Sequence, residues 1–179
     1  MFNFFGKSSD QVTVNDQVWM NANAKRNAIV KMAQASDNCH FVCWFENTKS
    51  DLEATLRSYN VAAQVSMADA VVQQNTRVLW LFVEHYPLSE TEQALFKKLG
   101  LSNVPVLSAL DEPFFQHFSG ERMVTLMQRL GMNEDEIVAH SMITRAIKNA
   151  QKKIAQQVRS EKRASSQTEW YKINLGKEL

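Results

Sequence analysis

The stretch TRVLWLFVEHY, residues 76–86, is the most strand-like part of this 179-residue chain. It has no polar residue between Val78 and Val83, so apolar residues do not alternate with polar ones as they do in a strand with one solvent-exposed face. An unbroken apolar run of this kind is typical of a strand that is covered on both faces. We therefore expect a central, buried strand that ends at Pro87, because proline has no N–H to donate to a sheet.

Weaker strand patterns and helical patterns alternate on both sides of this strand. The sequence predicts strands over 40–46, 61–66 and 104–110, and helices over 23–36, 47–60, 67–75 and 89–100. In the last of these helices Ser89 and Glu92 match a capping box, and Gly100 stands where a C-terminal cap belongs. Strands separated by helices of about twelve residues favour a mainly parallel sheet with helical crossovers. The predicted fold class is therefore α/β, with three layers.

Beyond residue 110 the pattern becomes helical. A long helix is predicted from about Ser141, with one apolar stripe made by Ile143, Ile147, Ala150, Ile154 and Val158. The stripe is lost after Ala164. The sequence thus predicts an N-terminal arm (1–20), an α/β lobe (21–110), a helical extension (111–164) and a flexible tail (165–179).

Charge is distributed unevenly along the chain, although the net charge is only +1. Residues 145–179 hold nine Lys/Arg and three Asp/Glu, whereas residues 1–144 hold eleven Lys/Arg and sixteen Asp/Glu. A basic segment next to an acidic body can bind acidic protein, phospholipid or nucleic acid. The alternative is a basic helix face that meets only solvent.

The two cysteines, with no recognisable secretory signal, indicate a reducing cytoplasm. No run of about 18 apolar residues is present, so no membrane-spanning segment is predicted. Cys39, His40 and Cys43 lie close together in CHFVC, but no second Cys/His pair follows at the spacing of a zinc site. We interpret this segment as a buried strand and expect no metal.

Catalytic motifs are hard to find. The five glycines are scattered, so there is no Walker loop and no dinucleotide-binding loop. No GxSxG motif is present. Glu84 and His85 follow the strongest strand, at the end where α/β sheets usually place their sites, and are the best active-site candidates. The alternative is that they are simply polar residues leaving a strand.

The segment from Leu110 to Ile154 resembles SecA, the motor ATPase of bacterial preprotein translocation. The residues that carry the resemblance occur in the order and spacing of that family over about 45 residues. They are Asp111, Glu112, Phe118, Arg122, Leu130, Gly131, Met132, Glu134, Glu136, His140, Arg145, Ala146, Ile147, Asn149, Ala150, Gln151 and Lys153. Residues 41–58 and 77–96 look like two strand–helix units of the same family.

This resemblance implies a RecA-like lobe that corresponds to the second nucleotide-binding domain of SecA and the start of its scaffold helix. The family's Walker loops have no counterpart, and its arginine motif is replaced by ETEQALFKKLGLSN (90–103), which keeps Lys97 and Lys98. ATP hydrolysis needs phosphate and Mg²⁺ contacts from two lobes. We therefore expect no enzyme activity and no cofactor.

The resemblance favours an interaction or regulatory module associated with protein translocation, in the cytoplasm or at the periphery of the inner membrane. We expect the long helix to protrude and to meet SecA, the translocation machinery or a second copy. The expected partner-binding residues are Arg122, His140, Arg145, Lys148, Lys152 and Lys153.

Two alternatives remain open. One is a small enzyme with an unrelated site near Glu84 and His85. The other is a nucleic-acid binder that uses the basic segment, which ranks last because the body is acidic and that segment has few aromatic residues.

Overall fold

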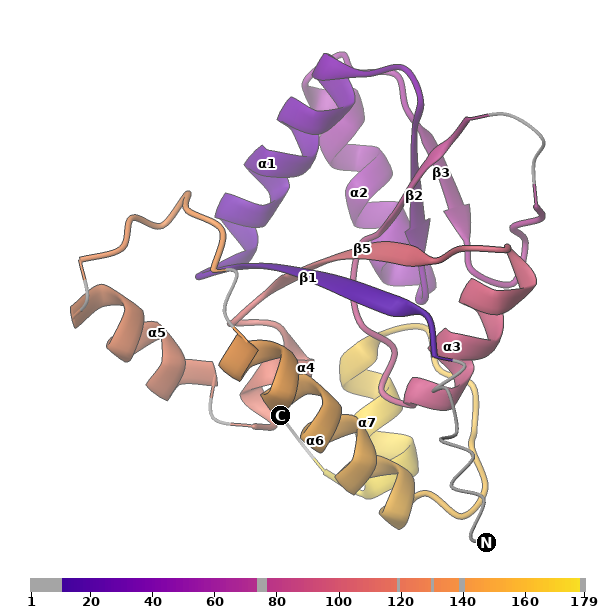
Figure 1. The fold of residues 1–179 in the computed structure, drawn as a ribbon, viewed down its shortest axis with the longest axis vertical. Helices are drawn as coiled ribbons and strands as arrows, with labels where there is room; N and C mark the ends of the chain where they lie inside the picture. Colours follow the sequence, from indigo (N-terminus) through magenta and orange to yellow (C-terminus); the bar gives the residue numbers. More distant parts are fainter. Residues whose placement is uncertain (1–10, 74–76, 119, 130, 139–140, 178–179) are drawn as a thin grey trace, which may run out of the picture.

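The computed structural model describes residues 11–73, 77–118, 120–129, 131–138 and 141–177 (Figure 1). The strands of this part of the chain are β1 (Thr13–Trp19), β2 (Cys39–Cys43), β3 (Gln64–Met67), β4 (Leu79–Phe82) and β5 (Asn103–Ala109). Its helices are α1 (Ala22–Ala35), α2 (Glu46–Ser58), α3 (Ser89–Lys98), α4 (Pro113–Gln116), α5 (Gly120–Arg129), α6 (Ser141–Gln157) and α7 (Gln167–Leu175).

The five strands form one parallel sheet in the order β1-β5-β4-β2-β3, which confirms the α/β class. Helices α1 and α2 cover one face of the sheet and α3 covers the other. Helices α4 to α7 gather at the carboxyl ends of the strands, where they form a third core with Val18, Phe45 and Leu110.

The central strand β4 is buried on both faces, as its sequence predicts. Leu81 packs into the core beneath α1 and α2, whereas Trp80 and Phe82 pack into the core beneath α3. The strand is shorter than the apolar run that predicts it, since it begins at Leu79 and ends at Phe82. Its neighbour β2 alternates in the same way, with Phe41 and Val42 on opposite faces.

Two elements in the first half of the chain differ from the prediction. Residues 13–19, expected in an N-terminal arm, form the edge strand β1, which the polar run Asn15, Asp16 and Gln17 had hidden. The helix expected over 67–75 is absent from the described residues of that range. Ala68 and Val71 are both buried there by a turn, in which the N–H of Ala70 donates to the carbonyl of Met67 at 3.0 Å. Apolar residues three apart therefore mark a turn rather than a helix.

The C-terminal part also differs from the prediction. Helix α6 does not protrude: Ile143, Ile147, Ala150 and Ile154 are each at most 3% exposed and pack against the body. The expected flexible tail contains α7 instead. The chain turns back after α6, so the apolar pattern restarts on a new helix. None of the helices that the structure describes is long and apolar enough to cross a membrane.

Helix α7 has capping residues at both ends. The Ser166 side chain accepts a hydrogen bond from the N–H of Glu169, and Gly176 closes the helix with a φ of 64°. Trp170 and Tyr171 are 0% exposed. The indole N–H of Trp170 donates to Glu161 at 2.8 Å. This helix is therefore a full part of the third core.

We expect Trp170→Ala to lower the free energy of unfolding by about 3–5 kcal/mol, because a buried tryptophan leaves a large cavity. Urea denaturation followed by circular dichroism would measure it. Ile173→Ala, on the same helix but at a residue that is 40% exposed, is the control and should cost less than about 1 kcal/mol. Equal, small effects of both changes would contradict a docked α7.

Candidate functional site

The site candidates Glu84 and His85 lie at the carboxyl end of β4, where the direction of winding reverses. From β2 the chain passes through α2 to β3 on one side, and from β4 it passes through α3 to β5 on the other. In open α/β sheets, ligands bind in the crevice at such a point. The contacts of these two side chains therefore decide whether the crevice can still accept a ligand.

Glu84 fills its part of the crevice with its own carboxylate. One oxygen accepts hydrogen bonds from the N–H groups of Trp44 (3.1 Å) and Phe45 (3.3 Å), and the other accepts the hydroxyl of Thr48 (2.8 Å). The two N–H groups belong to the residues that lead into α2, and Thr48 lies in its first turn. The Glu84 carboxylate is therefore held by the chain itself at the entry to this helix.

The positive charge next to Glu84, that of Lys25, is already paired within the chain. The Lys25 ammonium donates to the carbonyl of Val83 at 2.6 Å and forms an ion pair with Glu112. Burial raises the pKa of Glu84 to about 7, although Lys25 and Thr48 act in the opposite direction. A cavity of about 380 Å³ borders this group and is lined by Lys25, Glu84, Glu112 and Gln167 among others.

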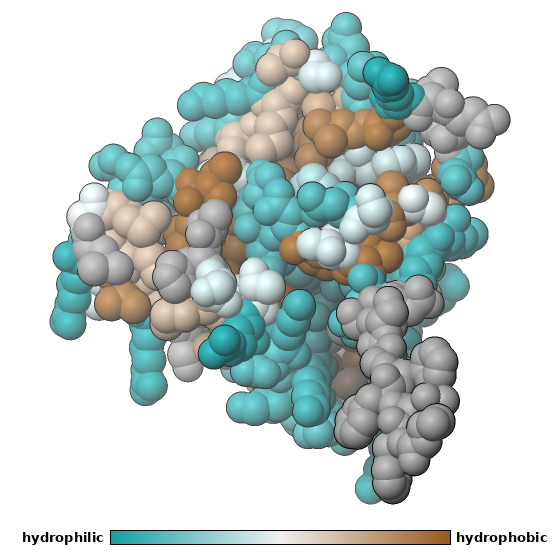
Figure 2. All heavy atoms as spheres, viewed as in Figure 1, coloured by the Kyte–Doolittle hydropathy of each residue, from teal (hydrophilic) through white to brown (hydrophobic). Residues whose placement is uncertain are grey.

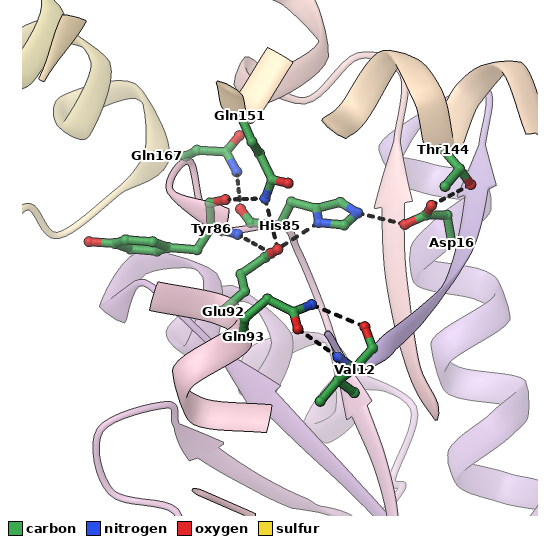
Figure 3. A network of polar contacts seen from close by, with 9 residues as sticks. All are labelled: Val12, Asp16, His85, Tyr86, Glu92, Gln93, Thr144, Gln151 and Gln167. Atoms are coloured by element: carbon green, nitrogen blue, oxygen red, sulfur yellow. Dashed lines mark hydrogen bonds and ion pairs between the residues drawn. The ribbon is translucent and has the colours of Figure 1, made fainter. Parts of the chain in front are cut away.

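His85 points into a different environment, between two carboxylates (Figure 3). Its Nδ1 lies 3.0 Å from Glu92 and its Nε2 lies 3.0 Å from Asp16, and the side chain is 2% exposed. Burial alone would lower the pKa of His85, but the two carboxylates outweigh it and raise the pKa to about 10. The ring is therefore an imidazolium at neutral pH, with both nitrogens donating, and has no free lone pair to act as a base.

Asp16, His85 and Glu92 form a buried triad of charged groups, and further hydrogen bonds connect this triad to the surrounding helices (Figure 3). Asp16 accepts the hydroxyl of Thr144 at 2.5 Å, and Glu92 accepts the side-chain amide of Gln151 at 2.7 Å. The Gln167 amide donates to the carbonyl of His85 at 3.1 Å. The network joins β1, the end of β4, α3, α6 and α7. This geometry favours a structural role, and Glu84 and His85 do not form an acid–base pair with each other.

Nothing in the local sequence patterns of Asp16, Thr144 and Gln151 marks them as members of a buried polar cluster. Glu92 makes a contact that differs from the capping box predicted for it. It does reach back to a backbone N–H, but that of Tyr86 (2.7 Å), and Ser89 is the first residue of α3 rather than its cap. Gly100 adopts a φ of 68°, which confirms the predicted helix end.

Cys39, His40 and Cys43, which lie close together in the sequence, do not point to one place. Cys39 and Cys43 face the core beneath α1 and α2, whereas His40 stacks on Trp80 on the other face and bonds Ser66 at 2.9 Å. Burial raises the pKa of the Cys43 thiol, so this cysteine stays protonated. Among the residues that the structure describes, no cluster of three His, Cys, Asp or Glu side chains could hold a metal ion.

The predicted partner-binding residues lie on two helices, and His140 lies outside the described residues. Arg122 is exposed on α5. Arg145, Lys148, Lys152 and Lys153 are exposed on α6 and are here called the basic face. The first three are spaced by three and four residues, so they form one ridge. This ridge lies opposite the buried apolar stripe.

The chain is partly homologous to SecA. A stretch of 46 residues is 48% identical to the protein translocase subunit SecA of Methylococcus capsulatus and to that of Laribacter hongkongensis. A stretch of 49 residues is 45% identical to SecA of Syntrophobacter fumaroxidans. These matches cover 26–27% of this chain and 5–6% of the length of those SecA proteins. No protein-family model matches the chain.

We expect His85→Leu to lower the free energy of unfolding by about 3–5 kcal/mol, because Asp16 and Glu92 would be left as uncompensated buried charges. Urea denaturation would measure the loss. Thr144→Val is the milder companion, since it removes one hydrogen bond to Asp16 and should cost about 1 kcal/mol. A His85→Leu protein as stable as the wild type would show that the triad adds nothing.

The pH dependence of stability tests the charge of His85. Its folded pKa of about 10 lies above the usual value of 6.5, so the folded state binds more protons than the unfolded state between these values. The stabilisation should be complete below about pH 6.5 and lost as pH rises toward 10, with a slope of at most about 1.4 kcal/mol per pH unit. Unfolding titrations across this range would measure it. Glu84→Gln should keep this slope, and its loss in that control would implicate Glu84 instead.

Proposed function

We propose that this chain is a SecA-related module that hydrolyses no ATP and acts in protein translocation by binding a protein partner. Its location would be the cytoplasm or the periphery of the inner membrane. The observation that carries the proposal concerns α6, which lies in the segment that resembles SecA. This helix has a buried apolar face and an exposed basic face. Because its apolar stripe is buried against its own lobe, only the basic face remains available for a partner.

The chemistry of the sheet's carboxyl edge supports the absence of catalysis. A phosphate placed at the start of α2 would have to displace the Glu84 carboxylate from two N–H groups and a hydroxyl. The nearby cation Lys25 is already neutralised by Glu112. The Glu84 carboxyl group therefore fills this part of the crevice, which supports the proposal that the chain hydrolyses no ATP.

The charge of α6 indicates an acidic partner surface. Within the described part of the chain, Arg145, Lys148, Lys152 and Lys153 form no ion pair with any carboxylate. Figure 2 shows a hydrophilic surface over α6, so the contact would be electrostatic rather than apolar. Such contacts mainly raise association rates and weaken as salt increases. SecA itself or the translocation machinery is the partner we propose.

A second candidate function is favoured by the cavity beside Glu84. A carboxyl group with a pKa of about 7 next to a cavity of about 380 Å³ has the properties of a general base. Against it, both oxygens of Glu84 already accept hydrogen bonds from the chain itself. A small enzyme is therefore the weaker proposal.

The combined change Arg145→Ala, Lys152→Ala and Lys153→Ala should weaken binding to purified SecA, or to vesicles carrying the translocon, at least tenfold. Biolayer interferometry at low and high salt would measure it, and the wild-type affinity should fall as salt rises. The matched control removes three exposed cations elsewhere on the chain, Lys31, Arg57 and Arg77, and should bind like the wild type.

Unchanged binding by the first triple variant would overturn the role of the basic face. Polyuridylate serves as the competing probe. If it bound tightly with a steep salt dependence while neither SecA nor the translocon vesicles bound, nucleic-acid binding would replace the proposal.

A further inference from the structure

A groove of about 740 Å³ runs between α3 and α6, beside the start of β1. Its apolar lining consists of Val12, Val14, Leu88, Ile147, Ala155 and Val158. The buried polar groups that also line it are bonded to one another (Figure 3). His85 lies between Asp16 and Glu92, and Gln151 donates to Glu92. The groove therefore favours an occupant that binds through apolar contact.

The described part of the chain starts in this groove, because both Gln11 and Val12 line it. The side chain of Gln93, on α3, holds Val12 at this place (Figure 3). Its amide oxygen accepts the N–H of Val12 at 2.8 Å, and its amide nitrogen donates to the carbonyl of Val12 at 3.1 Å. The segment that precedes Gln11 is therefore attached at a fixed point of the groove wall.

Residues 1–10, which precede this point, have the composition of an apolar segment on a polar tether. They read MFNFFGKSSD, so Phe2, Phe4 and Phe5 are followed by five residues that are small or polar. Five residues span at most about 17 Å. The groove extends about 16 Å along α6, from Ile147 to Val158. The three phenylalanines are thus within reach of its apolar lining.

We propose that this groove is the docking site of residues 2–5 of the same chain. The rings of Phe2, Phe4 and Phe5 pack between α3 and α6, and residues 6–10 connect them to Gln11. The occupant comes from the same chain because a short tether keeps it at an effective concentration on the order of millimolar. A second copy or another protein would have to displace it from there. This inference does not depend on the translocation role.

Disulfide trapping in the whole chain tests this docking. Phe4→Cys combined with Ala155→Cys places one thiol on the docking segment and one in the groove, and mild oxidation should join them within one molecule. Cys39 and Cys43 are 3% and 0% exposed and therefore stay out of the reaction. Gln156→Cys replaces Ala155→Cys in the matched control, since residue 156 is exposed on the same helix but outside the groove lining. Its disulfide should form at least tenfold more slowly.

A second pair of changes separates apolar docking from simple tethering. Phe2→Ser with Phe5→Ser, added to the first double-cysteine protein, should slow its disulfide at least tenfold. Lys7→Ser with Asp10→Ser, which changes the tether alone, should leave the rate as it was. Electrophoresis without reductant, followed by mass spectrometry of the linked peptides, would measure all the rates.

Three outcomes would overturn the proposal. Equal rates at residues 155 and 156 would show that the segment is not held in the groove. A rate that survives the loss of Phe2 and Phe5 would show that the tether alone brings the thiols together. A disulfide-linked dimer in place of the intramolecular bond would show that the groove takes residues 2–5 of a second copy.

Discussion

The imidazolium of His85, buried between Asp16 and Glu92, is the constraint on which the rest of the structure depends. Three ionised groups taken out of water stabilise one another only while all of them keep their geometry. Asp16 comes from the edge strand and Glu92 from the helix that follows His85. Thr144 and Gln151 attach α6 to the same charges. The sheet, α3 and α6 are therefore held in one relative position.

This constraint explains how the carboxyl edge of the sheet is used. In an α/β fold that edge normally faces a ligand. Here Glu84 accepts hydrogen bonds from Trp44, Phe45 and Thr48 at the entry to α2. The backbone carbonyls of His85 and Tyr86 accept the side-chain amides of Gln167 and Gln151. The edge has become the base on which α4 to α7 are packed. The surface that we propose for a partner is the exposed basic face of α6.

The partial homology to SecA fits this division of roles. An amphipathic helix of this kind can bury its apolar stripe within one chain or offer it to another. In this chain the apolar stripe is buried within the same chain, because Ile143, Ile147 and Ile154 pack with Trp170 in the third core. The charged side of the helix is what it presents outward, and recognition through charge is sensitive to salt and to the sign of the partner.

The sequence by itself determined the α/β class, the buried central strand and the apolar stripe of α6, because each depends on the spacing of neighbouring residues. It also showed the basic residues of α6 and their likeness to SecA. Only the tertiary structure decided that Asp16, His85 and Glu92 form one charged cluster, since they lie on three separate elements. The same reason hid β1, whose polar centre is stable as a strand only beside β5 and His85, and α7, whose Trp170 is buried only because the chain folds back.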